Sequence, residues 1–189
     1  MLEFEKKTLL TKEEFLFLRE NLYGENVCQQ QTNYYYDTND LSMNRQGITC
    51  RIREKDGRFI ATHKAHNTDR SIEKSMVVTG ISDLFPLSQI PLRRKGSLTT
   101  QRYRWYLEDG ITVFLDENSY IDITDYELEI EYQEGKESLA YLEIQRIADL
   151  LSRYGFIHSA GEIVGRLICS KSKSQRFFNR YTQVHAESG

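Results

Sequence analysis

The chain has 189 residues, of which 39% are hydrophobic and 28% are charged, and its formal net charge is −3. This length suits one domain, and this composition is typical of a globular protein rather than a disordered or fibrous one. The near-neutral charge argues against a nucleic-acid binder, and the apolar runs are too short for a transmembrane helix. The acid-containing N-terminus is unlike a signal peptide, and three widely spaced cysteines indicate neither a disulfide framework nor a zinc site. We therefore expect a cytoplasmic protein.

Most of the chain alternates apolar and polar residues, which predicts β-strands. Several of these runs are joined by hairpin signals such as Asp56-Gly57, and strands joined by such short turns must be antiparallel. Eight strands are predicted, over residues 2–9, 29–37, 47–55, 58–65, 72–79, 98–107, 111–118 and 123–133.

Helices are predicted near both ends of the chain. Residues Thr11 to Glu14 form a capping box ahead of apolar residues at helical spacing. A second helix is predicted over residues 136–154, ending at Gly155, and a third, more weakly marked, near 170–180. Eight strands with flanking helices predict an α+β fold, mainly antiparallel β, in which the strands close into a barrel. We expect a single domain over residues 1–178, followed by a tail at 179–189.

Charged residues share a face on several predicted strands, because residues two apart point to the same side. On most of these strands, though not on the first, they have one sign. They could be ordinary solvated faces, but like charges stacked on one face repel each other unless a ligand of opposite charge cancels them. Acids suit hard divalent cations and bases suit polyphosphate oxygens, so Mg²⁺ or Mn²⁺ with a polyphosphate would satisfy both in one cavity. The charged positions are Glu3, Glu5 and Lys7; Arg51, Arg53 and Lys55; Lys64; Arg102 and Arg104; and Glu127, Glu129 and Glu131.

An ordered series of motifs resembles the CYTH, or triphosphate tunnel, superfamily, and most closely its small branch in Gram-positive bacteria. The series covers residues 1–178 and begins with the E-x-E-x-K signature Glu3-Phe4-Glu5-Lys6-Lys7. It continues with Tyr35-Tyr36-Asp37-Thr38, Cys50-Arg51-Ile52-Arg53, Thr62-His63-Lys64, Thr100-Gln101-Arg102, Leu115-Asp116, Glu127-Leu128-Glu129-Ile130-Glu131 and Lys171-Ser172-Lys173.

The resemblance implies an eight-stranded antiparallel tunnel that binds a triphosphate together with Mg²⁺ or Mn²⁺. By the same resemblance, Glu3, Glu5, Glu127 and Glu129 would be metal ligands or would orient water on the metal. Lys7, Arg51, Arg53, Lys64 and Arg102 would bind phosphate oxygens, and Lys173 would close the tunnel. Glu5, Glu129 and Lys7 are the expected catalytic residues, with Asp116, Glu131, Arg104 and Glu73 as secondary candidates.

Two departures from the family pattern bear on substrate choice. Thr100 stands where many members have lysine, and Ser75 stands where a second acid is common. The expected activity is hydrolysis of a triphosphate, with inorganic triphosphate favoured over a thiamine or nucleoside triphosphate. The alternatives are a class IV type adenylate cyclase and a non-catalytic polyphosphate-binding domain.

The expected partner is a small-molecule triphosphate bound by a monomer or homodimer, with no membrane and no nucleic acid. A basic C-terminal segment, which also contains Phe177 and Phe178, could contact RNA. We expect instead that it caps the barrel or forms a solvated helix face. Its basic residues are Lys171, Lys173, Arg176 and Arg180.

Overall fold

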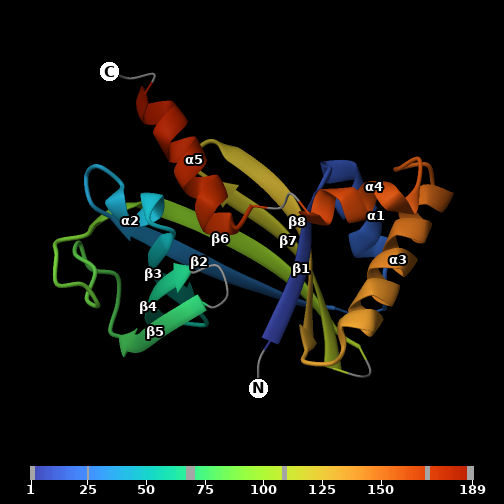
Figure 1. Ribbon diagram of the computed structural model, residues 1–189, viewed down its shortest axis with the longest axis horizontal. Helices are drawn as coiled ribbons and strands as arrows, with labels where there is room; N and C mark the ends of the chain where they lie inside the picture. Colours follow the sequence, from blue (N-terminus) through green and yellow to red (C-terminus); the bar gives the residue numbers. More distant parts are fainter. Residues whose placement is uncertain (1–2, 25, 67–70, 108–109, 169–170, 187–189) are drawn as a thin grey trace. The chain divides into compact units, whose positions relative to one another are not determined.

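The structure, a computed structural model, describes residues 3–24, 26–66, 71–107, 110–168 and 171–186 (Figure 1). Within these ranges the chain forms one eight-stranded sheet, in the order β1-β8-β7-β6-β2-β3-β4-β5. The strands are β1 (Glu3–Leu10), β2 (Val27–Asp37), β3 (Ile48–Lys55), β4 (Arg58–His66), β5 (Ser71–Val78), β6 (Arg93–Tyr106), β7 (Ile111–Tyr120) and β8 (Ile123–Gln133). The helices are α1 (Lys12–Asn21), α2 (Ser42–Arg45), α3 (Glu137–Arg153), α4 (Ala160–Ile168) and α5 (Lys173–Ala186).

All eight predicted strands are present, and the antiparallel α+β class is confirmed. The largest difference in bounds is β6, which starts at Arg93 rather than near residue 98. The closed barrel is not confirmed. Closure requires a hydrogen-bonded partner for every strand edge, whereas the order of the sheet ends at β1 on one side and at β5 on the other. Within the described ranges, no ladder joins these two strands.

The chain divides into two compact units. The first unit comprises Met1–Gln29, Gln101–Asn118 and Thr124–Ser170, and the second comprises Gln30–Thr100, Ser119–Ile123 and Lys171–Gly189. The prediction of one domain over residues 1–178 stays a prediction, and its C-terminal boundary falls inside α5. No helix in the described ranges is long and apolar enough to span a membrane.

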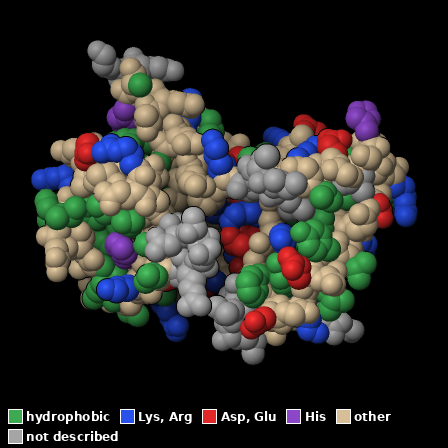
Figure 2. All heavy atoms as spheres, in the orientation of Figure 1, with side chains coloured by type: hydrophobic (Ala, Val, Ile, Leu, Met, Phe, Trp, Pro, Cys, Tyr) green, Lys and Arg blue, Asp and Glu red, His purple; other side chains and the backbone are tan. Residues whose placement is uncertain are grey.

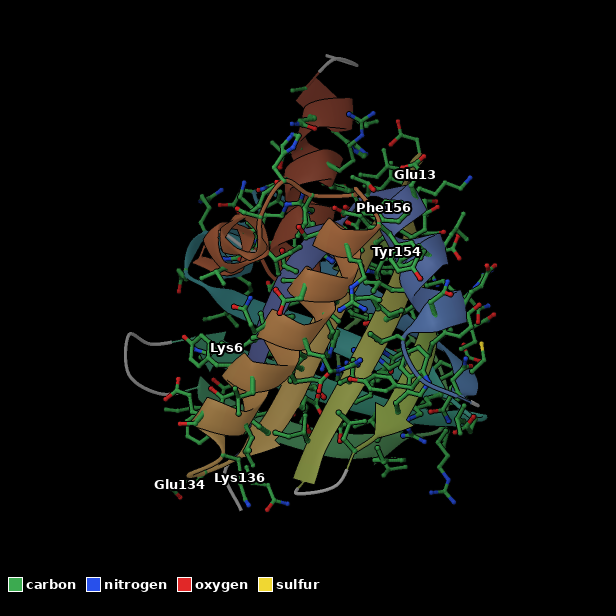
Figure 3. The ribbon with its side chains drawn as sticks, turned by 90° about the vertical axis from the view of Figure 1, so that its right-hand side faces the viewer. Lys6, Glu13, Glu134, Lys136, Tyr154 and Phe156 are labelled. Atoms are coloured by element: carbon green, nitrogen blue, oxygen red, sulfur yellow. The ribbon has the colours of Figure 1, made fainter. Side chains whose placement is uncertain are left out.

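The core of the first unit lies between one face of its strands and the helices α1, α3 and α4. Figure 3 shows α3 running across the strands, with Lys6 of β1 beside it. The predicted capping box of α1 is confirmed, because the Glu14 backbone N–H donates to Thr11 Oγ1 (3.2 Å) and the Thr11 N–H donates to Glu14 Oε2 (2.7 Å). The fully buried core side chains include Phe15, Leu18, Val113, Leu115, Ile147, Leu151 and Ile163.

Helix α4 was not predicted, although its sequence AGEIVGRLI is rich in apolar residues. It packs on α3 and β1. Arg166 of α4 donates from Nη1 to both carboxylate oxygens of Glu14, at 2.9 Å each. Glu14 is only 1% exposed, so one carboxylate both caps α1 and fixes α4 against it.

Apolar side chains also reach the surface over α3 (Figure 2). They include Leu142, which is 66% exposed, and Tyr141, over whose ring Lys6 Nζ lies 5.0 Å from the centroid. Isolated exposed apolar residues are ordinary on protein surfaces, and we assign these no role.

The second unit has a hydrophobic cluster on each face of β2. Tyr36 packs with Cys50 and Ile52 on one face, whereas Tyr35 packs with residues of α5 on the other. The ring centroids of Phe177 and Phe178 lie 4.8 and 5.8 Å from that of Tyr35. The C-terminal helix is therefore anchored by its aromatic residues.

Two of the basic residues in the C-terminal segment bind within the second unit. Arg180 forms an ion pair with Asp122. Arg176 is 7% exposed and donates to the Lys171 carbonyl at 2.7 Å. These contacts favour a helix packed on the sheet over an RNA-binding arm.

Gly96 permits the close approach of β6 to α5. A Cβ added at Gly96 would lie 2.9 Å from Phe177 Cζ, and Phe177 is fully buried, so it has no room to move. We expect Gly96→Ala to lower the free energy of unfolding by about 1–3 kcal/mol, as overpacking of a core does. Gly80→Ala is the matched control, since nothing lies within 4 Å of the added Cβ. Chemical denaturation would measure the free energy of unfolding of both variants. Equal values would show that Phe177 can move enough to accommodate the added Cβ.

Candidate functional site

Strand β8 separates apolar and acidic residues onto its two faces, as predicted. Leu128, Ile130 and Tyr132 belong to the core of the first unit. The glutamates alternate with them, but they are not the solvated residues of an ordinary sheet surface. Glu127 is fully buried and Glu129 is 5% exposed. Burying carboxylates costs free energy unless they are paired or coordinate a metal, so this face needs a compensating positive charge.

Strand β1 adds its charged face to the same side of the sheet. Antiparallel pairing places Glu5 opposite Glu131 and Lys7 opposite Glu129, and directly opposed residues share a face. Lys7 Nζ forms an ion pair with the Glu5 carboxylate. Glu3 begins β1 opposite Gln133, and its side chain lies outside the described part of the structure.

Three buried carboxylates converge from β7 and β8. One ligand oxygen from each of Asp116, Glu127 and Glu129 lies within 4.8 Å of the other two. Asp116 and Glu127 have no exposed surface. Hard oxygen donors at this spacing are the ligands that Mg²⁺ and Mn²⁺ prefer, so these residues fit a divalent metal. The sequence analysis named Asp116 only as a secondary candidate. Asp116 follows the alternating core residues Val113 and Leu115 of β7, which places it on the opposite face of that strand.

Arg102 of β6 lies against this acid trio. Its Nε and Nη2 donate to the two carboxylate oxygens of Asp116 at 2.8 and 2.7 Å, and Nη2 also reaches Glu129 Oε2 at 3.1 Å. Burial by itself would lower the pKa of Arg102, but Asp116, Glu129 and Glu131 outweigh it and raise that pKa. The guanidinium therefore stays charged and neutralises part of the trio. The sequence analysis predicted that Arg102 binds phosphate oxygens. It did not predict this contact with the carboxylates of Asp116 and Glu129.

Arg104 follows on the same face of β6. Its guanidinium lies over the Tyr106 ring, 4.6 Å from the centroid. Its buried Nε has no hydrogen-bond partner in the described part of the chain. Arg104 therefore has a donor to offer to a ligand, whereas Arg102 is held by acids.

The remaining predicted cations lie in the second unit. Register places Arg51 opposite Tyr35 and Arg53 opposite Asn33, and Arg53 Nε donates to Asn33 Oδ1 at 3.0 Å. On its other side, Arg51 lies opposite Thr62 of β4. Lys64 is two residues after Thr62 and therefore on the same face of β4. Lys64 Nζ lies 3.9 Å from the carboxylate of Glu73 on β5. Lys173 is the first residue of α5.

The two departures from the family pattern are accommodated locally. Ser75 Oγ lies 3.1 Å from Thr62 Oγ1 and donates to Glu73 (3.2 Å). Thr100 is fully buried. Each position thus holds a small hydroxyl residue where many members of the family have a charge.

The structure brings Asp116, Glu127 and Glu129 together in the first unit, with Lys7 and Arg102 beside them. Glu73 lies instead in the second unit, beside Lys64. Arg51, Arg53, Lys64 and Lys173 belong to the second unit. The prediction that acids and cations line one cavity stays a prediction. Asn33 and Tyr35 face the same side as Arg51 and Arg53. The sequence analysis did not name Asn33, and it named Tyr35 only within a motif, without a role. Their alternation with Tyr34 and Tyr36 along β2 could have placed both on this face.

Comparison with known protein families agrees with this pattern of acids and bases on successive strands. The model of the CYTH domain matches residues 1–155. The chain belongs to the CYTH domain family. In sequence it is 29% identical over 161 residues to Bacillus subtilis YjbK, a protein provisionally named a triphosphatase, covering 75% of this chain and 84% of YjbK.

Two solved structures resemble the fold of this chain. A Bacillus halodurans protein, provisionally described as an adenylate cyclase, superposes with a TM-score of 0.68 at 28% identity, over 94% of this chain and 97% of the other. The Hippeastrum protein HpAC1, described as having a dominant triphosphatase activity, superposes with a TM-score of 0.56 at 18% identity, over 82% and 89% of the two chains. The second comparison supports the fold alone.

Proposed function

We propose that this CYTH protein is a divalent-metal-dependent phosphohydrolase that cleaves inorganic triphosphate. The observation that carries the proposal is the buried trio Asp116, Glu127 and Glu129, whose oxygens lie within 4.8 Å of one another. Three charged carboxylates held this close repel one another, and Arg102 offsets only part of their charge, so a divalent cation would stabilise the group further. The name of the 29% identical relative YjbK supports hydrolysis of a triphosphate.

The acid trio would hold the metal, either Mg²⁺ or Mn²⁺. When bound, such an ion neutralises phosphate oxygens and activates water. Glu5 lies on the strand next to β8, on the same face as Glu129, and we assign these two carboxylates to orienting the attacking water. Glu3 belongs to the same acidic set by the E-x-E-x-K pattern.

The cations bind the phosphate oxygens in this proposal. Lys7 lies opposite Glu129, and Arg104 has an open donor. We also assign four cations of the second unit to phosphate binding, on the basis of their charge and of the element that carries each one. They are Arg51, Arg53, Lys64 and Lys173. Water attacks the terminal phosphorus, the phosphoanhydride P–O bond breaks, and phosphate and diphosphate leave. Catalysis is then mainly orientation and electrostatic stabilisation, without a covalent enzyme intermediate.

A second candidate function is cyclisation of ATP, because the Bacillus halodurans structure carries the description of an adenylate cyclase. A cyclase must hold the nucleoside so that the ribose 3′-hydroxyl reaches the α-phosphorus, and it must exclude water there. The buried acids and the cations named above serve a metal and phosphate oxygens, which both reactions need. Hydrolysis requires nothing further except a positioned water, and we therefore favour it.

The products decide between these functions. We expect inorganic triphosphate to be cleaved to phosphate and diphosphate with a higher kcat/KM than that for ATP. ATP turnover should release phosphate with little or no cyclic AMP. Chromatography of the products from both substrates, at matched Mg²⁺ or Mn²⁺ concentration, measures this. Cyclic AMP as the main product from ATP would establish the cyclase instead, and binding without turnover would establish a polyphosphate-binding domain.

A further inference from the structure

One face of β2 buries a row of polar side chains. Gln31, Asn33 and Tyr35 are 5%, 0% and 0% exposed. Residues two apart on a strand share a face, and the register places Asn33 and Tyr35 beside Arg53 and Arg51 of β3. Unlike the opposite face of β2, where Tyr36 packs with apolar residues, this face combines neutral polar groups with cations.

Three hydrogen-bond donors on this face have no acceptor within the described ranges. They are Asn33 Nδ2, Tyr35 OH and Arg51 Nε, and all three atoms are buried. Buried polar atoms are normally paired, so a group of unpaired donors requires an explanation. Because all three can donate and lie on one face of the sheet, they offer hydrogen bonds to a ligand with several acceptor atoms.

The two neutral side chains are held in place. Asn33 Oδ1 already accepts from Arg53 Nε at 3.0 Å, which fixes its amide and leaves Nδ2 as the open donor. The Tyr35 ring is packed by Phe177 and Phe178, with centroids 4.8 and 5.8 Å away. Neither group can turn to solvent without disrupting these contacts, so both donors are preorganised.

The charge around Tyr35 is positive. Burial raises the pKa of Tyr35, and it outweighs the nearby cations Arg51, Arg53, Lys173 and Arg176, which lower that pKa. The hydroxyl therefore keeps its proton at neutral pH. A single buried water could accept from two donors at most, so it would leave one of the three without an acceptor. An anion with several acceptor oxygens can accept from all three, and the neighbouring cations attract it.

We propose that Asn33 and Tyr35 contact the ligand directly and, together with Arg51, form a subsite for one phosphoryl group of a polyphosphate. The polyphosphate as ligand rests on the proposed function; the subsite itself rests on the three unpaired donors. Neutral donors with fixed directions add geometric selection to the attraction that arginines and lysines provide.

Two substitutions test the subsite with little change in shape. Tyr35→Phe removes only the hydroxyl. Asn33→Asp keeps an oxygen to accept from Arg53 and replaces the open donor by a negatively charged oxygen. Tyr34→Phe is the matched control, because the Tyr34 hydroxyl donates to Glu54 (3.0 Å) on the opposite face of β2. The probe is inorganic triphosphate, titrated calorimetrically into the metal-free protein so that binding is measured without turnover.

We expect Tyr35→Phe to weaken binding of inorganic triphosphate about tenfold or more, the effect of losing one hydrogen bond to a charged group. Asn33→Asp should weaken it further, because it adds repulsion. The melting temperature of ligand-free Tyr35→Phe should equal or exceed that of the wild type, since an unpaired buried hydroxyl is removed. Tyr34→Phe should bind as the wild type does.

Wild-type affinity in both Tyr35→Phe and Asn33→Asp would overturn the subsite. If Asn33→Asp fails to fold, Tyr35→Phe decides alone. A wild-type protein that binds inorganic triphosphate but does not hydrolyse it, with both variants weakened, would leave the subsite standing and refute the proposed hydrolase. A wild-type protein that binds neither inorganic triphosphate nor phosphate would overturn both.

Discussion

Glu129→Gln is expected to lower kcat for triphosphate hydrolysis about 10²-fold or more, by analogy with loss of one preorganised electrostatic group. Glu129 is 5% exposed, and its oxygen lies within 4.8 Å of those of Asp116 and Glu127. Glutamine keeps the shape of the side chain but removes the charge that attracts a divalent cation. Stopped-time assays with saturating Mg²⁺ or Mn²⁺ would measure kcat, and Mn²⁺ titration would measure metal affinity, which should fall as well.

The same loss of activity is expected for Glu5→Gln, because Glu5 faces the same side as Glu129. Glu13→Gln is the matched control, since Glu13 is exposed on α1 and points away from the sheet (Figure 3). Glu5→Gln and Glu129→Gln should keep the fold, because removing one of several clustered acids relieves repulsion. Glu13→Gln should keep it because Glu13 is exposed. Small and equal effects at the three positions would mean that the strand glutamates do not take part in the reaction.

Arg102→Met is expected to destabilise the metal-free protein by about 3–5 kcal/mol, the cost of removing one partner from a buried ion pair. Arg102 binds Asp116 through two hydrogen bonds and Glu129 through a third. Without it, three buried carboxylates face one another. For a chain of this length the change corresponds to a fall in melting temperature of roughly 6–20 °C. Thermal melts in the presence of a chelator measure it.

Divalent cations should partly restore the stability of Arg102→Met, because a metal supplies the charge that the guanidinium no longer provides. The increase in melting temperature on adding Mg²⁺ or Mn²⁺ should therefore be larger for Arg102→Met than for the wild type. Arg104→Met is the control, since Arg104 stacks on Tyr106 and its Nε has no partner among the described residues. A chelated Arg102→Met protein that melts at the wild-type temperature would show that the acid trio does not depend on this cation.

The sequence by itself determined the local features of this protein. All eight strands and the helices α1 and α3 follow from periodicity and from caps such as Thr11 and Glu14, which depend on residues a few positions apart. The separation of Glu127 and Glu129 from the apolar residues of β8 has the same origin. The alternation also indicated the acidic face of the candidate site, whose carboxylate oxygens suit a divalent metal.

Only the tertiary structure decided which residues meet. Asp116 joins Glu127 and Glu129, and Arg102 binds acids rather than standing as an isolated cation, because strand order and register bring distant segments together. The tertiary structure also decided that Glu127 and Glu129 of β8 are buried, because alternation in the sequence cannot distinguish a solvated acidic face from a buried one. That the donors of Asn33 and Tyr35 lack acceptors among the described residues is likewise visible only once their neighbours are in place. Hydrogen-bond closure of the sheet also depends on pairing between its two end strands, which no local pattern in the sequence encodes.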